Sequence, residues 1–370
     1  MTSSARPLRV LHLTGPMNRG GVESWVMNLL RHADRRELAL DIATTGAGEA
    51  VYDAEIEALG ARLLRCPHPE KPWVFGPRFL GLLREHGPYD AVHSHLHHFS
   101  GLAMGLARRA GVPVRVVTSH LDSSLPDGGA GPARRLYLGA MRRLINTQAT
   151  DRLAVGPEAA AALYGPDWQA RGVRVERLGL DLRALREAVD AAGVRAELGL
   201  PPGEPVLINV ARLAPAKNQA FLLEVFAAFR ERHGRGQLLL VGDGPLRGEL
   251  EEKARLLRLE GVHFLGSRPD VPRVLSAADV FIFPSLFEGL GLAIVEAQVT
   301  GLPCVVAAHL TPGSRLPGAH HFTLRLEDGA AAWVDAVQEA LAAGRAEADG
   351  SAFDIATNLR DLMRLYGRAQ

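Results

Sequence analysis

The sequence predicts an α/β protein with two domains, each built on a parallel sheet. The chain has 370 residues, which is too long for one ordinary hydrophobic core and suits two domains of typical size. Short apolar strands alternate with amphipathic helices, a pattern that favours parallel sheets covered by helices. The alternation occurs in two series with an interruption between them, so we expect two sheets.

The two series are separated by a proline-rich break. Strands of the first series are expected at residues 8–14, 90–95, 114–120 and 151–156, with helices near 23–32, 101–110 and 133–145. Strands of the second series are expected at residues 205–213, 237–245, 262–267, 279–285 and 303–308. The break between Leu178 and Pro205 contains GLPPGEP, so we place one domain at 1–178 and the other at 179–352.

Composition and charge exclude several classes of protein. The formal net charge of +1 gives no electrostatic case for a nucleic-acid partner. No apolar run approaches the ~20 residues that a membrane span needs, and the N-terminal residues lack the pattern of a signal peptide. The only cysteines, Cys66 and Cys304, have no metal-ligand spacing around them, which fits a reducing compartment. We therefore expect a cytoplasmic protein.

The stretch FPSLFEGLGLAIVEA (283–297) places a glycine-rich helix start between two glutamates. Glycines let a backbone approach a ligand closely, and the N–H groups and dipole of a helix start attract a diphosphate. The carboxylates of Glu288 and Glu296 would accept hydrogen bonds from vicinal hydroxyls on either side of it. A sugar nucleotide has this order of groups. The alternative is that both glutamates only complement the helix dipole or face solvent.

The E-x7-E pattern from Glu288 to Glu296 resembles the signature of retaining GT-B glycosyltransferases of the family 4 type. This resemblance implies two Rossmann-like domains that face a central cleft, with a C-terminal helix crossing back to the N-terminal domain. Residues 1–178 together with 353–370 would then bind the acceptor, and residues 179–352 would bind the donor.

The resemblance also assigns the residues that bind the donor. Arg212 and Lys217, in VARLAPAKNQ, would clamp the diphosphate, which suits a planar guanidinium fork and a point charge. Gly242 in VGDGPLR would lie near the nucleoside, and the loop with Arg268 would meet the base. The alternatives are solvated cations and a plain turn. The backbone that would hold phosphate comprises Gly289, Leu290, Gly291 and Leu292.

The N-terminal half matches the acceptor domain of the same family. Gly20 and Gly21, in TGPMNRGGVES, would lie against the donor phosphate and the reacting sugar. No G-x-G-x-x-G fingerprint is present, which disfavours a dehydrogenase. His120 ends the strand that contains TSH and would hydrogen-bond the transferred sugar, so His120 and Glu288 are the expected catalytic residues. The alternative for His120 is a histidine satisfied by backbone groups.

The stretch HSHLHH (93–98) raises the alternative of a metal site. In an extended chain His93, His95 and His97 would share one face, as metal ligands can. The sequence offers no obvious carboxylate or cysteine partner nearby, and no D-x-D pattern is present. The family binds its donor with cations and a helix start, so we expect no metal and no cofactor.

The resemblance implies transfer of a hexose or hexosamine with retention, in polysaccharide or natural-product biosynthesis including antibiotic assembly. UDP-linked donors are favoured over GDP-linked ones. A helix with Arg134, Arg135, Arg142 and Arg143 could rest on an anionic membrane and meet a lipid-linked acceptor, or these arginines face solvent and the acceptor is a small molecule. The competing functions are a sugar-nucleotide epimerase, a glycosyl phosphorylase, and a nucleotide-sugar-binding protein without catalysis. The oligomeric state is left open.

Overall fold

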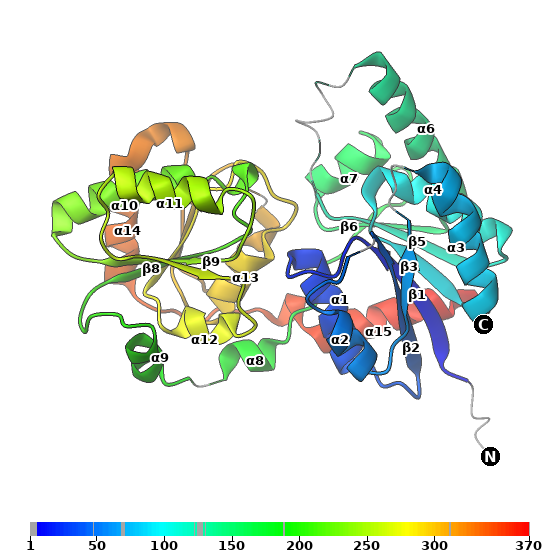
Figure 1. The fold of residues 1–370 in the computed structure, drawn as a ribbon, viewed down its shortest axis with the longest axis horizontal. Helices are drawn as coiled ribbons and strands as arrows, with labels where there is room; N and C mark the ends of the chain where they lie inside the picture. Colours follow the sequence, from blue (N-terminus) through cyan, green and yellow to red (C-terminus); the bar gives the residue numbers. More distant parts are fainter. Residues whose placement is uncertain are drawn as a thin grey trace. The chain divides into compact units, whose positions relative to one another are not determined.

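The computed structural model describes residues 6–46, 48–67, 71–121, 123, 129, 131–187, 189–310 and 312–369. These residues form two compact units (Figure 1). Unit 1 comprises Met1–Leu180 and Phe353–Gln370, and unit 2 comprises Asp181–Ala352. Each unit contains its own parallel sheet with helices on both faces, which confirms the α/β prediction.

The sheet of unit 1 has seven parallel strands in the order β3-β2-β1-β4-β5-β6-β7. The strands are β1 (Leu8–Thr14), β2 (Leu38–Thr45), β3 (Leu63–Cys66), β4 (Ala91–Ser94), β5 (Val114–Ser119), β6 (Asp151–Ala154) and β7 (Arg174–Val175). Its helices are α1 (Gly21–His32), α2 (Asp53–Ala58), α3 (Pro72–His86), α4 (Ser100–Arg109), α6 (Pro132–Gln148), α7 (Pro157–Tyr164) and α15 (Ile355–Tyr366). Helices α1 and α15 pack together on one face, and α3, α4 and α6 pack on the other (Figure 1).

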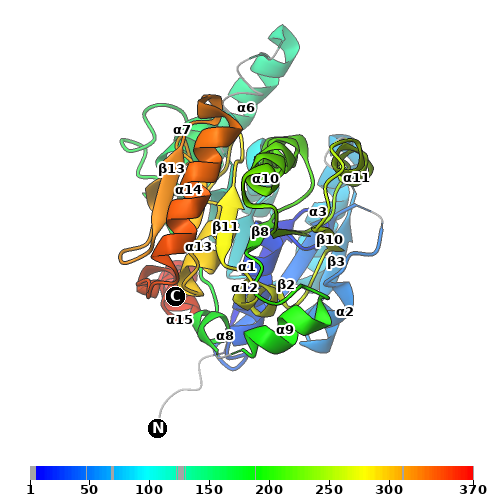
Figure 2. The same cartoon turned by 90° about the vertical axis from the view of Figure 1, so that its left-hand side faces the viewer.

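The sheet of unit 2 has six parallel strands in the order β10-β9-β8-β11-β12-β13. The strands are β8 (Val206–Val210), β9 (Gln237–Val241), β10 (Val262–Gly266), β11 (Val280–Phe283), β12 (Cys304–Ala307) and β13 (His321–Leu324). Its helices are α8 (Leu182–Arg186), α9 (Ala191–Glu197), α10 (Gln219–His233), α11 (Arg247–Leu256), α12 (Val271–Ser276), α13 (Leu292–Val299) and α14 (Gly329–Ala343). Helix α14 packs beside α10 (Figure 2), while α12 and α13 lie on the other face (Figure 1).

The strand order in each sheet fixes where a ligand can bind. In unit 1 the order reverses between β1 and β4, and in unit 2 it reverses between β8 and β11. At such a switch point the connections leave in opposite directions and open a crevice beyond the carboxyl ends of the two strands. The candidate ligand-binding residues are therefore those that follow β1, β4, β8 and β11.

Four strands of the structure were not among those predicted from the sequence. They are β2, β3, β7 and β13. Strand β13 is an edge strand with no fully buried residue, and β7 has only two residues, so neither has the apolar run of a central strand. Strand β2 contains Asp41, whose carboxylate is paired with Arg62.

In the ranges that the structure describes, no helix has the length and apolarity to cross a membrane.

Candidate functional site

Lys217 and Glu288 meet at the switch point of unit 2. Lys217 ends the short 3-10 helix η2 (Pro215–Lys217) that follows β8, and Glu288 follows β11. The Lys217 ammonium forms an ion pair with the Glu288 carboxylate, and these side chains are 22% and 10% exposed. The two loops are also joined by the backbone, because the N–H of Leu286 donates to the carbonyl of Ala216 at 2.7 Å. The structure therefore brings together two predicted donor-binding residues that lie 71 positions apart in the sequence.

Two buried side chains form hydrogen bonds with the backbone around the loop that carries Lys217. The Gln219 side-chain amide donates to the carbonyl oxygen of Arg212 at 3.1 Å, and the Asn209 amide donates to the carbonyl of Ile282 at 2.7 Å. Asn218 takes the left-handed conformation, with φ +54°, between η2 and α10. These bonds fix the backbone from β8 to α10, so Lys217 is presented by a rigid support.

Arg212, the other predicted cation, is exposed at the end of β8. Within the described ranges its side chain makes no hydrogen bond or ion pair, whereas Lys217 has both a carboxylate partner and the ring of Phe283, 5.8 Å from its nitrogen to the ring centroid. A free guanidinium at this edge is available to an anionic ligand, but its position is not fixed by partners.

The glycine-rich helix start is present as predicted. Gly291 is the N-cap of α13 with φ +71°, a conformation that strains any residue with a Cβ, and Gly289 and Leu290 are buried. Leu292 is the first helical residue, so the backbone N–H groups of the helix start lie directly after Glu288. The helix ends before Gly301, at φ +87°, where the sequence places its stop.

Glu296 lies on the second turn of α13 and is half-buried. Burial raises the pKa of its carboxyl to about 7. No side-chain partner of this carboxyl occurs among the residues that the structure describes. A carboxyl group held without an ionic partner on the helix that starts at the glycines is free to accept hydrogen bonds from a ligand.

Gly242 and Arg268 have structural partners. Gly242 has φ +132°, and a Cβ there would overlap the carbonyl oxygen of Ala211, so the glycine is required for β9 to pass the end of β8. Arg268 forms a two-pronged pair with Asp270 at 2.8 and 2.7 Å. This pairing engages the guanidinium fork within the protein, so Arg268 would have to leave Asp270 before its side chain could contact a base.

In unit 1, the glycine loop after β1 leads into α1. Gly20 is the N-cap of α1 and Gly21 is its first residue. A Cβ on Gly20 would overlap the carboxylate of Glu23, which lies in the first turn of the same helix. The predicted glycines therefore form a helix start beside the switch point of the sheet.

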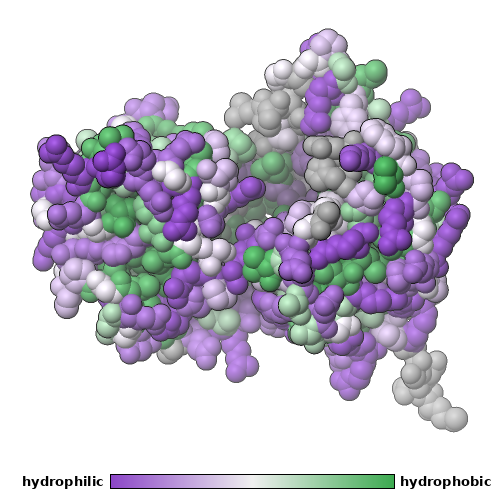
Figure 3. Space-filling view, in the orientation of Figure 1, coloured by the Kyte–Doolittle hydropathy of each residue, from purple (hydrophilic) through white to green (hydrophobic). Residues whose placement is uncertain are grey.

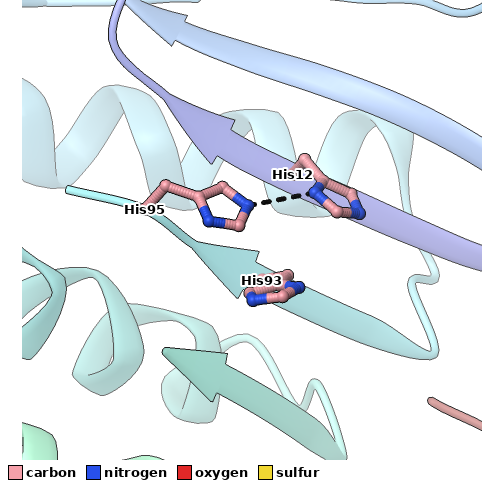
Figure 4. A group of neighbouring side chains, drawn as sticks. All are labelled: His12, His93 and His95. Atoms are coloured by element: carbon pink, nitrogen blue, oxygen red, sulfur yellow. Dashed lines mark hydrogen bonds between the residues drawn. The ribbon is translucent and has the colours of Figure 1, made fainter. Parts of the chain in front are cut away.

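His120 belongs to a buried cluster of imidazoles at the switch point of unit 1. His12 on β1 is paired in register with His93 on β4, and His95 follows β4 (Figure 4). The Nε2 of His95 lies 3.1 Å from the Nδ1 of His12, and its Nδ1 lies 2.9 Å from the Nε2 of His120. Burial lowers the pKa values of His12 and His120 to about 3. These imidazoles are therefore neutral.

The metal alternative takes a different form from the one raised by the sequence. His97 has φ +50° in the 3-10 helix η1 (His97–Phe99), so the chain turns there and the expected face of three alternate histidines does not form. Instead, His12, His93 and His95 offer ring nitrogens within 4.8 Å of one another. Both nitrogens of His93 already have partners, and His12 and His95 bond to each other. The group is thus built as a hydrogen-bond network.

The C-terminal helix supplies residues that the sequence analysis missed. The hydroxyl of Tyr366 on α15 lies 2.7 Å from the Nδ1 of His93. Trp25 packs edge-on against His95 and donates to the Asn358 side chain on α15 at 2.8 Å. A tyrosine and an asparagine on the apolar face of a terminal helix are the sequence signal that could have pointed to this network.

Helix α6 carries the arginines considered for membrane contact. Arg142 turns inward and donates to the carbonyls of Leu163 and Ala162, so it does not join the exposed arginines. Leu136 is 78% exposed near the start of the helix. The face in Figure 3 is mostly hydrophilic, with hydrophobic residues scattered between the polar ones. Of the four arginines considered for membrane contact, Arg134, Arg135 and Arg143 are exposed and Arg142 is not, and the choice between membrane and solvent stays open.

Two family models and several relatives match this chain. Residues 204–343 match the model described as glycosyl transferases group 1, and residues 20–167 match the model described as a glycosyl transferase 4-like domain. The chain is 39% identical over 351 residues to "Putative glycosyltransferase EpsF" of Bacillus subtilis (strain 168), which covers 93% of this chain and 90% of that one. It is 32% identical over 325 residues to the D-inositol 3-phosphate glycosyltransferase of Mycobacterium sp. (strain KMS), covering 80% and 71%.

A solved structure shares the fold. The crystal structure of Anabaena Alr3699/HepE in complex with UDP and glucose superposes with a TM-score of 0.76 at 20% sequence identity. The match covers 96% of this chain and 98% of that one. Both parallel sheets and the returning C-terminal helix thus belong to one GT-B architecture.

Proposed function

Because this chain belongs to the family 4 type of group 1 glycosyltransferases, we propose that it is a retaining hexosyltransferase whose donor is a UDP-sugar. The observation that carries the proposal is the meeting of Lys217, Glu288 and the start of α13 at the switch point of unit 2. Cation, helix start and carboxylate are the groups that a sugar diphosphate requires. The HepE structures, which hold UDP or UDP-glucose, support the choice of uridine.

In this proposal the diphosphate is bound by positive charge from the protein. Lys217 offers three N–H donors, of which Glu288 engages one, so the others remain for phosphate oxygens. Arg212 is exposed and adopts its position when the anion arrives. The start of α13 donates backbone N–H groups to the same anion. These charges stabilise the leaving diphosphate, and we propose that no metal is needed.

Glu288 and Glu296 serve the two ends of the donor. Glu288 is oriented by Lys217 and accepts hydrogen bonds from hydroxyls of the transferred sugar. Glu296, one turn further along α13, accepts them from the ribose. His120 contributes a hydrogen bond to the transferred sugar from unit 1. Catalysis then consists of positioning and charge stabilisation, with the leaving phosphate as the base that receives the proton of the incoming hydroxyl.

The acceptor is a hydroxyl compound of polysaccharide or natural-product assembly. The name of one relative, D-inositol 3-phosphate glycosyltransferase, supports a hydroxyl compound as the acceptor. The exposed residues Arg134, Arg135 and Leu136 at the start of α6 favour a lipid-linked acceptor at an anionic surface, and a soluble acceptor is the other candidate.

The proposal is tested by thermal unfolding with nucleotide sugars in the presence of EDTA. A bound donor at 100 times its Kd stabilises the folded state by about 2.7 kcal/mol. We expect UDP-glucose or another UDP-sugar to raise the unfolding midpoint, and Glu288→Gln and Glu296→Gln to weaken this shift. If both glutamate variants bind the donor like the wild type, the site is wrongly assigned.

Lys217 also stabilises the fold, so the Lys217→Ala variant has to be compared with a second variant. Lys217→Ala leaves the Glu288 carboxylate nearly buried without its cation, which costs roughly 1–3 kcal/mol of stability. Lys217→Ala combined with Glu288→Gln removes both charges and should restore most of that stability. Donor binding should stay absent in both variants. Recovery of donor binding in the double variant would show that Lys217 does not touch the diphosphate.

A further inference from the structure

The buried hydroxyl of Thr118 sets the direction of a series of hydrogen bonds in unit 1. Thr118 lies on β5 and is 2% exposed. Its Oγ1 lies 2.6 Å from the Nε2 of His93, and no other partner for this hydroxyl occurs in the described part of the chain. A buried hydroxyl proton without an acceptor is costly, so Thr118 donates and His93 accepts at Nε2.

The next two hydrogen bonds of the series involve the hydroxyl of Tyr366. A neutral imidazole has one donor and one acceptor nitrogen, so His93 carries its proton on Nδ1 and donates to the Tyr366 hydroxyl at 2.7 Å. The Tyr366 hydroxyl proton points onward to the Nε2 of His12 at 3.4 Å, the longest link of the series. Burial raises the pKa of Tyr366, so the phenol keeps this proton.

The remaining two links follow by the same rule. His12 accepts at Nε2 and therefore donates from Nδ1 to the Nε2 of His95 at 3.1 Å (Figure 4). His95 donates from Nδ1 to the Nε2 of His120 at 2.9 Å. Burial lowers the pKa values of all four histidines, which leaves one proton on each ring. His120 must then carry its proton on Nδ1.

The Nδ1 of His120 is buried and has no hydrogen-bond partner among the residues that the structure describes. An N–H group in this state needs an acceptor that a ligand brings. We propose that Thr118, His93, Tyr366, His12 and His95 form a directed series that holds His120 as a hydrogen-bond donor at Nδ1. His120 thus donates to an oxygen of the transferred sugar and has no free nitrogen with which to act as a base.

This inference rests on the proposed function only for the identity of the ligand oxygen. The proton position itself is a property of the free protein. It assigns positioning roles to residues far from His120, since Thr118 is five hydrogen bonds away along the series. It also explains why a tyrosine of the C-terminal helix is buried among histidines, because the series would be interrupted between His93 and His12 without it.

Nuclear magnetic resonance of the full chain labelled with 15N-histidine tests the proton position directly. We expect His120, His95 and His12 each to show a protonated Nδ1 and a bare Nε2 near pH 7. Thr118→Val keeps the shape but removes the hydroxyl, so it should allow the opposite tautomers to appear. Thr118→Ser is the matched control and should keep the wild-type tautomers. A protonated Nε2 on His120 in the wild type would overturn the proposal, whatever the enzyme's donor is.

Activity provides the second readout. His120→Asn places an amide N–H near the position of Nδ1, whereas His120→Gln places it near Nε2, so both should lower turnover and the Gln variant should lose more of it than the Asn variant. For Thr118→Val we expect kcat to fall about tenfold, the equivalent of one hydrogen bond, with little change in the donor KM. Equal activity of the two His120 variants would contradict the donor role. Tautomers in Thr118→Val that stay as in the wild type would contradict the directed series, whereas the expected tautomers without any glycosyl transfer by the wild type would point to an error in the proposed reaction.

Discussion

The ionisation of Glu296 couples the stability of the protein to pH. Its carboxyl is half-buried on α13 without an ionic partner, and burial raises its pKa to about 7. A folded-state pKa above the unfolded value means that ionisation opposes folding. Stability from this group is fully present below the unfolded pKa of about 4.3 and is lost as the pH rises through 7.

We therefore expect Glu296→Gln to stabilise the protein increasingly between pH 5 and pH 8. The gain at pH 8 should be at most about 3 kcal/mol, because each unit of pKa shift corresponds to about 1.4 kcal/mol and the group is only half-buried. Urea unfolding of both proteins at several pH values measures the difference. Glu231→Gln, at an exposed position on α10, is the control and should show no comparable trend. A difference between wild type and Glu296→Gln that is constant with pH would contradict the assignment.

The chain after β9 passes close to the chain after β8 because Gly242 has no side chain. A Cβ on Gly242 would overlap the carbonyl oxygen of Ala211, and its φ of +132° is strained for any other residue. We expect Gly242→Ala to lower the free energy of unfolding by roughly 1–3 kcal/mol or more. Gly248→Ala is the matched control, because Gly248 lies exposed in α11 with nothing near its Cβ position and should be neutral or slightly stabilising.

Chemical denaturation of the two glycine variants separates the structural role from a ligand role. If Gly242→Ala unfolds at the wild-type denaturant concentration but binds donor poorly, the glycine serves nucleoside binding rather than the close approach of the two chain segments.

The helices and strands were largely predictable from the sequence, but the side-chain partners of the site residues were not. Strand β1 was predicted at its observed bounds, and the helix start after Glu288 was predicted from Gly289 and Gly291, because glycine, proline and apolar runs act locally. The ion pair between Lys217 and Glu288 was not predicted. It depends on the order of β8 and β11 in the sheet, which no local pattern encodes. Both residues were predicted to bind one ligand, and the structure adds that they contact each other.

The chain returns to unit 1 after completing unit 2. Helix α15 buries Leu359, Leu362 and Tyr366 in unit 1. Gly179 lies against this helix, and a Cβ there would lie 2.8 Å from the Cα of Ile355. The close approach explains the glycine at the end of the first segment. The contact between Tyr366 and His93 joins residues 273 positions apart, so sequence periodicity could place the helix but not its hydroxyl.

This topology makes the two units unequal in their ability to fold alone. The core of unit 2 lies entirely between Leu200 and Ala340, so residues 181–352 contain every strand and helix that surrounds it. Residues 1–180 lack α15, and without it the face with Trp25 and His93 loses its cover and its hydrogen-bond partners.

We expect the 181–352 fragment to unfold cooperatively on heating, monitored by circular dichroism. The 1–180 fragment should unfold at a much lower temperature, and a peptide of residues 353–370 should raise that temperature because it supplies Asn358 and Tyr366. A variant peptide with Tyr366→Phe should restore less, since it packs similarly but leaves His93 and His12 without the hydroxyl that links them. Equal stability of the 1–180 fragment with and without peptide would show that α15 only covers the sheet and does not complete its fold.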